Sequence, residues 1–238
     1  MVEFDEYASG YTAGMEHPLK RLVGRDADAF LAVKARWLAR HLRGAGATAA
    51  PLRLLDYGCG IGAFLRALRE VGLRAEMAGC DASAGMLEEA VKRWDDATVP
   101  TLRLVREERA PFESASFDVV VLSSVLHHLS AEQRPRLLGD ALRLLAPRGR
   151  VVVFEHNPLN PVTRWVVRHT PIDRNATLVF PWQARRELAR LGAAHVTTRF
   201  LLFFPPRLAA LSRRERWLAR VPLGGQYVVV AEKGPAQN

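Results

Sequence analysis

Apolar positions along this chain follow two periods, one typical of buried strands and the other typical of amphipathic helices. Short, nearly continuous apolar runs suit strands that are covered on both faces. They predict strands at residues 51–56, 75–80, 102–105, 117–122, 150–154, 195–204 and 226–231. Apolar residues spaced three and four apart predict amphipathic helices. These helices are expected at residues 26–42, 63–71, 83–94, 134–145, 162–169, 181–191 and 207–220.

Strands and helices alternate from residue 51 to residue 155, which predicts an α/β fold with a parallel sheet and helices on both faces. After His156 this alternation becomes irregular. The chain of 238 residues can bury one sizeable core, and it shows no linker or internal repeat. We therefore predict a single domain, 1–238, with a helical lead-in at 1–50, a core at 51–155 and a final segment at 156–238.

Three glycines follow the first predicted strand, in the stretch LLDYGCGIG of residues 54–62. Glycine allows positive φ angles and closer contacts than a Cβ would permit. The helix that follows would direct its N-terminal N–H groups and its positive dipole end into the same crevice. The stretch therefore predicts a binding turn for the polar part of a nucleoside-like cofactor, although such glycines also serve plain packing.

An acidic residue, Asp81, ends the second predicted strand in the stretch GCDAS of residues 79–83. A carboxylate in this place can accept hydrogen bonds from the two hydroxyls of a ribose. A dinucleotide-binding fold would have a similar acid, and so would a solvated loop. The glycine pattern here is G-x-G-x-G, and no Tyr-x-x-x-Lys pair occurs, which argues against an oxidoreductase.

Four stretches together resemble the class I S-adenosylmethionine-dependent methyltransferases, in the small-molecule group that includes the quinone-pathway enzymes. They are LLDYGCGIG, GCDAS, APFESASFDVVVLSSVLHHL and LAPRGRVVVFE, which lie in this order within residues 54–155. The resemblance implies a Rossmann-like sheet with seven strands, mostly parallel, whose last strand is antiparallel. It also implies S-adenosyl-L-methionine as the cofactor and S-adenosyl-L-homocysteine as the product.

The resemblance also assigns the residues that contact the cofactor: Asp56, Gly58, Gly60, Gly62, Asp81, Ala82, Met86 and Ser123. In this assignment the glycines pass the methionine part and the ribose, and Asp81 holds the ribose hydroxyls. The chain departs from the family at Arg106, where relatives commonly have an aspartate that meets the adenine amine. Either Glu107 or Glu108 takes over that contact, or only backbone groups make it.

Histidines after the fourth and fifth strands are the candidates for a general base. A neutral imidazole has a suitable pKa for this work, and we assign the base role to His127 or His156. Relatives often carry a histidine at the position of His128, to which we assign a structural role. We expect no metal here, because adjacent histidines point apart on most backbones and no carboxylate–histidine motif accompanies them.

The formal net charge of +9 allows nucleic acid, an anionic membrane or an acidic substrate as partner, or simply solvated basic faces. Arg164, Arg168 and His169 could hold an anionic acceptor in the segment that follows the fifth strand. The basic, apolar helix at 207–220 could rest on a membrane surface. Tyr7 and Tyr11 could close over the cofactor as a lid.

We expect a cytoplasmic enzyme, because the chain shows no secretory signal, no membrane-spanning run and only two cysteines. Its expected activity is methyl transfer to a small molecule, whether natural-product, quinone-like or lipid-like, with the acceptor atom and oligomeric state left open. A nucleic-acid methyltransferase is the alternative that the charge suggests, but Ser123-Ser124-Val125-Leu126 replaces the motif of base-amine enzymes. A non-catalytic cofactor-binding protein is the third alternative.

Overall fold

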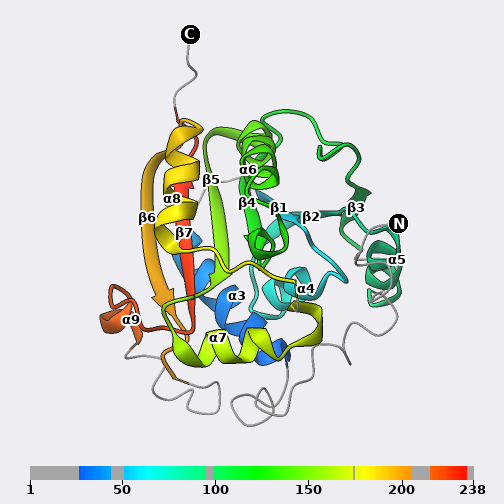
Figure 1. The fold of residues 1–238 in the computed structure, drawn as a ribbon. Coiled ribbons are helices and arrows are strands. Elements are labelled where there is room, and N and C mark those ends of the chain that lie inside the picture. Colours follow the sequence, from blue (N-terminus) through cyan, green and yellow to red (C-terminus); the bar gives the residue numbers. More distant parts are fainter. Residues whose placement is uncertain (1–26, 44–50, 95–98, 174, 205–214, 235–238) are drawn as a thin grey trace.

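The computed structural model describes residues 27–43, 51–94, 99–173, 175–204 and 215–234. Seven strands form one sheet in the order β3-β2-β1-β4-β5-β7-β6 (Figure 1). The strands are β1 (Leu52–Tyr57), β2 (Ala75–Asp81), β3 (Thr101–Leu104), β4 (Phe117–Ser123), β5 (Leu145–His156), β6 (Ala194–Leu201) and β7 (Gln226–Glu232). This arrangement confirms the predicted Rossmann-like α/β architecture.

The last strand is the antiparallel one. Strands β3, β2, β1, β4 and β5 pair in parallel, whereas β7 runs antiparallel to both β5 and β6. Residues 119–122 of β4 are buried on both faces of the sheet, as their unbroken apolar run predicts. The carboxyl ends of the five parallel strands therefore meet at one edge of the sheet.

Helices cover the sheet on both faces. Apolar side chains of α6 (Gln133–Leu144) and α8 (Pro181–Arg190) belong to one core cluster, and those of α3 (Ala27–Arg43) and α4 (Ala63–Glu70) belong to the other. Helix α5 (Ala84–Lys92) lies beside β2 and β3. Helix α7 (Pro161–Arg168) crosses the end of the sheet after β5 (Figure 1).

Some boundaries differ from the prediction. Strand β5 begins at Leu145, but its regular pairing with β4 starts only at Arg150, because the register shifts in between. Of the expected helix at 207–220, residues 215–220 are described, and the helix α9 (Glu215–Leu218) ends there in a turn. The expected lid residues Tyr7 and Tyr11 lie outside the described part of the chain. Within the described ranges, every helix is too short or too polar to cross a membrane.

Candidate active site

The glycine turn, residues 58–62, connects β1 to α4 at the carboxyl edge of the sheet. Its three glycines have φ angles of 80°, 51° and 71°, which an L residue with a side chain rarely adopts. The N–H groups of Gly58 and Cys59 both donate to the carbonyl oxygen of Cys80, at 2.7 and 3.0 Å. The turn is therefore fixed to the end of the neighbouring strand.

Gly58 and Gly60 serve different purposes in this turn. A Cβ on Gly58 would lie 2.6 Å from Cγ2 of Val125, so the loop after β4 packs directly on the bare backbone. A Cβ on Gly60 would meet no atom of the described residues within 4 Å. Gly58 is thus required for packing, whereas Gly60 borders open space where a bound molecule can approach the backbone.

Asp81 binds the glycine turn with its own carboxylate. Its Oδ2 accepts from the N–H of Gly60 at 2.7 Å, and its Oδ1 accepts from the N–H of Ser83 at 2.9 Å. The Oγ of Ser83 in turn accepts from Met86 N–H and caps α5. Asp81 is partly exposed, and the structure brings it beside the glycines as the sequence predicted.

Asp56 lies behind this turn with only 1% of its surface exposed. Among the residues that the structure describes, none gives its Oδ1 atom a hydrogen bond. Burial and the nearby charge of Asp81 raise the pKa of Asp56 to about 7, although Lys34 opposes this. A buried acceptor without a partner favours a ligand that brings a donor or a positive charge. The ammonium and sulfonium groups of S-adenosylmethionine meet that requirement.

Lys34 is a site residue that the sequence reasoning missed. It is 2% exposed, and its Nζ donates to the hydroxyls of Ser123 and Ser124, at 3.1 and 2.7 Å. Its position in the sequence could have indicated this role, because Lys34 lies four residues from both Phe30 and Leu38 on the apolar face of α3. A lysine in that place must direct its ammonium group to polar partners at the sheet edge.

The remaining residues that were expected to contact the cofactor differ in their exposure and in their partners. Ser123 lies at the end of β4 and faces Lys34. Ala82 is exposed, but Met86 is fully buried, so its burial does not favour an adenine contact. Glu107 is exposed at a turn with a φ of 50°, and Glu108 pairs with Arg136 at 3.0 Å. Their roles toward the cofactor stay predictions.

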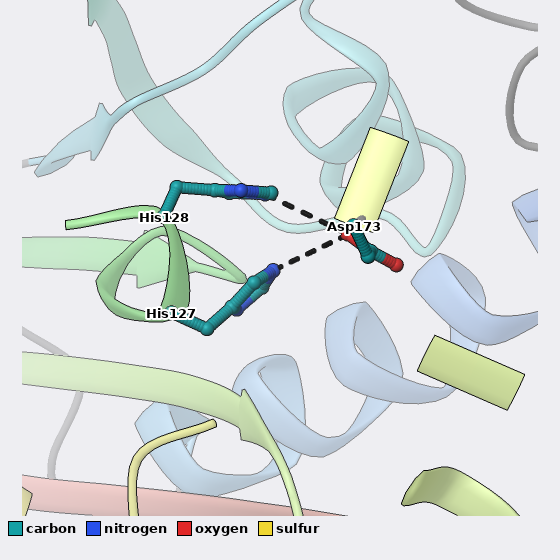
Figure 2. A group of neighbouring side chains, drawn as sticks. All are labelled: His127, His128 and Asp173. Carbon is teal, nitrogen blue, oxygen red and sulfur yellow. Dashed lines mark ion pairs between the residues drawn. The ribbon is translucent and has the colours of Figure 1, made fainter. Parts of the chain in front are cut away.

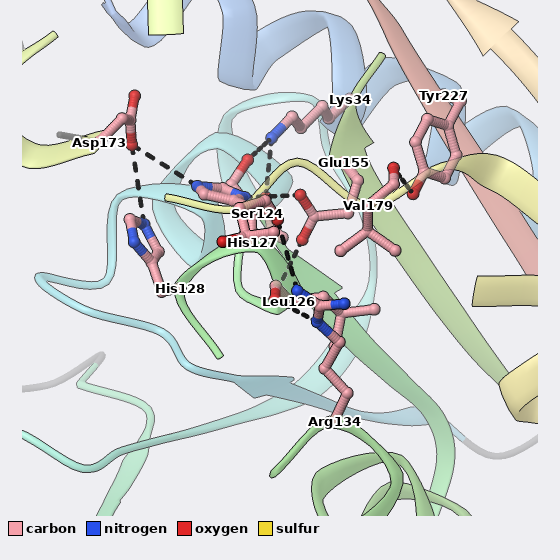
Figure 3. A network of polar contacts seen from close by, with 12 residues as sticks. Lys34, Ser124, Leu126, His127, His128, Arg134, Glu155, Asp173, Val179 and Tyr227 are labelled. Atoms are coloured by element: carbon pink, nitrogen blue, oxygen red, sulfur yellow. Dashed lines mark hydrogen bonds and ion pairs between the residues drawn. The ribbon is translucent and has the colours of Figure 1, made fainter. Parts of the chain in front are cut away.

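Four side chains from three segments meet at the carboxyl ends of β4 and β5, and we call them the histidine cluster: His127, His128, Glu155 and Asp173 (Figure 3). Nδ1 of His127 lies 2.6 Å from Oε2 of Glu155, and Oε1 of Glu155 accepts from Leu126 N–H at 2.7 Å. Nε2 of His127 and Nε2 of His128 lie 3.5 and 3.7 Å from Oδ1 of Asp173. Sequence reasoning found the histidines but missed both acids.

The two acids decide the charge of His127. Burial alone would lower the pKa of His127, but Glu155 and Asp173 outweigh it and raise that pKa to about 9. In the same way, burial would raise the pKa of Glu155, yet His127 holds it at about 2. A base that is already protonated and almost fully buried cannot easily accept a proton from a substrate. These values do not favour the predicted general-base role of His127.

His156 follows directly after Glu155, and its ring centroid lies 5.0 Å from that of His127. Burial and the adjacent positive charge of His127 lower the pKa of His156 to about 3. The imidazole is therefore neutral at physiological pH, but it is a weak base. Its predicted catalytic role stays a prediction, with hydrogen bonding to an acceptor as the chemistry that a neutral ring offers.

Backbone and side-chain contacts hold the loop residues 170–173 and 175–180 against η3 (Leu126–His128). Thr177 N–H donates to the carbonyl of His127 at 2.8 Å. The buried guanidinium of Arg134 donates to the carbonyl of Leu126 (Figure 3). It also donates to the carbonyl of Thr177. The hydroxyl of Tyr227 donates to the Val179 carbonyl at 2.8 Å. Asp173, in η4 (Pro171–Asp173), is thereby brought to the histidines.

Comparison with known proteins identifies the central part of the chain. Residues 55–153 match a family model described as a methyltransferase domain. A demethylmenaquinone methyltransferase of Thermotoga maritima is 32% identical over 111 residues, covering 46% of this chain and 46% of that protein. A probable tRNA methyltransferase 9B of Homo sapiens is 31% identical over 103 residues, covering 42% of this chain and 20% of that protein.

Solved structures agree on the fold. A SAM-dependent methyltransferase from Archaeoglobus fulgidus superimposes with a TM-score of 0.63 at 18% identity, covering 90% of this chain and 98% of that one. The chain thus has the class I S-adenosylmethionine-dependent methyltransferase fold and resembles quinone-pathway enzymes in sequence. The curated relatives above are matched over less than half of their length.

Proposed function

We propose that this protein, whose residues 55–153 form a class I S-adenosylmethionine-dependent methyltransferase domain, transfers the methyl group to a small-molecule acceptor. The observation that carries the proposal is the buried Oδ1 of Asp56, to which no residue in the described ranges gives a hydrogen bond, beside the carboxylate of Asp81. Two acids at a glycine turn favour a cationic nucleoside. An anionic dinucleotide phosphate would be repelled by the same charges.

The bound cofactor supplies an electrophilic methyl group on a positive sulfonium, which needs no further activation. The chain's own residues orient the partners. Gly60 leaves the backbone open to close approach, Asp81 lies where ribose hydroxyls can bind, and Asp56 offers an acceptor to the amino acid part. Orientation of this kind supplies roughly 7–11 kcal/mol of barrier lowering.

The acceptor approaches from the side of α7 and the histidine cluster in this proposal. Because His127 is held as an imidazolium and His156 is a weak base, neither removes a proton readily. The proposal therefore favours acceptors that ionise easily without a protein base, such as phenols and the reduced, phenolic form of quinone-like rings. Arg164 and Arg168 are exposed on α7 and could attract an anionic group of the acceptor.

Calorimetry with S-adenosylmethionine tests the cofactor part. We expect binding by the full chain, weakened at least tenfold in Asp81→Ala and unaffected in Asp118→Ala, because Asp118 pairs with Arg53 at the other end of the sheet. Absence of heat at millimolar cofactor would overturn the assignment. Incubation of a metabolite mixture with methyl-labelled cofactor then tests turnover, and cofactor binding without S-adenosylhomocysteine formation would point to a non-catalytic protein.

A nucleic-acid acceptor is the second candidate. The net charge of +9 and the similarity to a probable tRNA methyltransferase 9B favour it. Gel retardation of tRNA at low and at high salt distinguishes the candidates, because phosphate contacts weaken steeply with salt. If the protein does not retard tRNA even at low salt, the nucleic-acid acceptor is excluded and the small-molecule acceptor remains.

A lipid-like acceptor would require transient contact with a membrane surface, which we include in the proposal. Trp217 and Leu223 are 76% and 61% exposed near the end of the described chain. Aromatic and aliphatic side chains beside basic residues suit an anionic interface. Cosedimentation with anionic vesicles tests this contact, and loss of binding in Trp217→Ala would support it. The cytoplasmic location stays a prediction.

A further inference from the structure

The histidine cluster presents two imidazoles and one carboxylate to a common point (Figure 2). We propose that His127, His128 and Asp173 bind a divalent transition-metal cation, of which Zn²⁺ suits the ligand set best. The proposal goes beyond methyl transfer, because it rests on these side chains alone. It would hold even if the protein had no methyltransferase activity.

The distances within the cluster suit a shared metal better than hydrogen bonds. The two Nε2 atoms lie 3.5 and 3.7 Å from Oδ1 of Asp173, and the three ligand atoms all lie within 4.8 Å of one another. A nitrogen–oxygen hydrogen bond spans about 2.7–3.2 Å. Two ligands on one tetrahedral Zn²⁺, each at about 2.0–2.2 Å, lie about 3.3–3.5 Å apart. The two nitrogen–oxygen distances are already close to that spacing.

Glu155 gives His127 the orientation that a metal ligand needs. The 2.6 Å contact between Glu155 and Nδ1 keeps a proton on Nδ1 and directs Nε2 at Asp173. Without an ion the ring is an imidazolium, so a metal ion binds Nε2 by displacing its proton to solvent. Glu155 is itself fixed, because its second oxygen accepts from Leu126 N–H. Carboxylates that hold the distal nitrogen of a histidine are a regular feature of zinc sites, since they fix the ring and raise its basicity.

The expectation that adjacent histidines point apart does not hold at this position. The ring centroids of His127 and His128 lie 4.1 Å apart, and both rings reach the same carboxylate. Both histidines belong to the 3₁₀ turn η3. The contacts of Arg134 and Thr177 hold the loop of Asp173 there. The site is therefore formed by the folded chain before any ion binds.

The ligand set also determines the type of site. Two histidines and one aspartate are three protein ligands, which is the number that leaves a position open for water or a substrate oxygen. Imidazole nitrogen favours zinc and its neighbours over magnesium or calcium, which prefer oxygen ligands only. His128 is partly exposed at 19%, so the open position can face the solvent side of the cluster.

A zinc titration of the full chain, after dialysis against a chelator, tests the proposal. With a chromogenic chelator as competitor, we expect one equivalent of Zn²⁺ to bind, and at least tenfold weaker binding in His128→Ala and Asp173→Asn. Glu155→Gln should weaken binding about 10–100-fold as a positioning residue. His195→Asn is the matched control, because exposed His195 lies on β6 at the opposite edge of the sheet.

Co²⁺ gives a second readout that does not depend on affinity alone. We expect visible absorption bands of a low-coordinate Co²⁺ site in the wild-type chain and in His195→Asn, and their loss in His128→Ala. Equal Zn²⁺ binding by wild type and His128→Ala would overturn the proposal, as would no binding by either. Circular dichroism of each variant separates a lost site from a lost fold.

Discussion

The glycine turn and the histidine cluster lie at the same edge of the sheet but are built in different ways. The glycine turn comes from one continuous stretch, and backbone groups hold it to the next strand. The histidine cluster takes its side chains from η3, from β5 and from η4, and side-chain contacts join them. The first site depends on backbone conformation, whereas the second depends on the packing of distant segments.

The two regions also differ in how their charges are balanced. In the glycine turn, Asp56 is buried with an oxygen that lacks a partner in the described structure, and its pKa is raised. In the histidine cluster, Glu155 and Asp173 flank His127, and the pKa of each acid is lowered to about 2 despite burial. The comparison indicates that the turn has an unmet requirement for a ligand, whereas the cluster already contributes to stability.

The largest expected effect tests the stabilising role of the cluster. Glu155→Ala should lower the free energy of unfolding by about 3–5 kcal/mol. It leaves the buried ring of His127 without one acid and the N–H of Leu126 without its acceptor. Guanidinium unfolding followed by circular dichroism measures the change.

Glu232→Ala is the matched control on the same sheet, because Glu232 forms a partly exposed pair with Arg150 at 3.2 Å. Glu232→Ala should lower the free energy of unfolding by about 0–1 kcal/mol. Equal losses in the two variants would show that the cluster is not the stabilising network that its burial indicates.

The next effect tests the backbone origin of the glycine turn. Gly58→Ala should destabilise the protein by about 2–4 kcal/mol, because it combines a positive φ with a Cβ 2.6 Å from Val125. Gly60 also has a positive φ, but an added Cβ would meet no described atom. Gly60→Ala should therefore lower the free energy of unfolding by only about 1–2 kcal/mol. Thermal unfolding of both variants measures the difference.

A second substitution separates packing from backbone strain. Val125→Ala in the Gly58→Ala background should recover part of the lost stability, because the clash involves the methyl groups of Val125. If the double variant is no more stable than expected from the two single changes, the close contact is not the cause.

The smallest effect is a pH dependence at Asp56. Its pKa in the folded protein, about 7, lies above the ordinary value, so its contribution to stability is present at low pH and is lost as pH rises through 7. Relative to Asp56→Asn, wild type should lose about 1 kcal/mol between pH 6 and pH 7. The affinity for S-adenosylmethionine should rise over the same range, because the cation pairs with the ionised carboxylate.

Asp118→Asn is the control for this measurement. Arg53 lowers the pKa of Asp118 below its ordinary value, so its contribution to stability is constant from pH 6 to pH 7. Urea unfolding at the two pH values compares the variants. A flat difference between wild type and Asp56→Asn would contradict the raised pKa and its cause.

Much of the fold could be read from local patterns. The apolar run at 117–122 predicted a strand buried on both faces, and residues 119–122 of β4 are fully buried. The apolar spacing predicted a helix at 134–145, and α6 runs from Gln133 to Leu144. The start of β5 was predicted late, because the register shift before Arg150 is a property of the pairing with β4 and not of the local sequence.

The sequence by itself determined the alternation of strands and helices up to residue 155, the glycine turn and the position of Asp81. These depend on neighbours along the chain and on parallel strands that end at one edge. Only the tertiary structure decided that Lys34 faces Ser123 and that Asp173 meets His127 and His128. Those contacts join segments that are far apart in the sequence. Helix packing and loop contacts bring these segments together, and the local spacing of apolar residues carries no information about either.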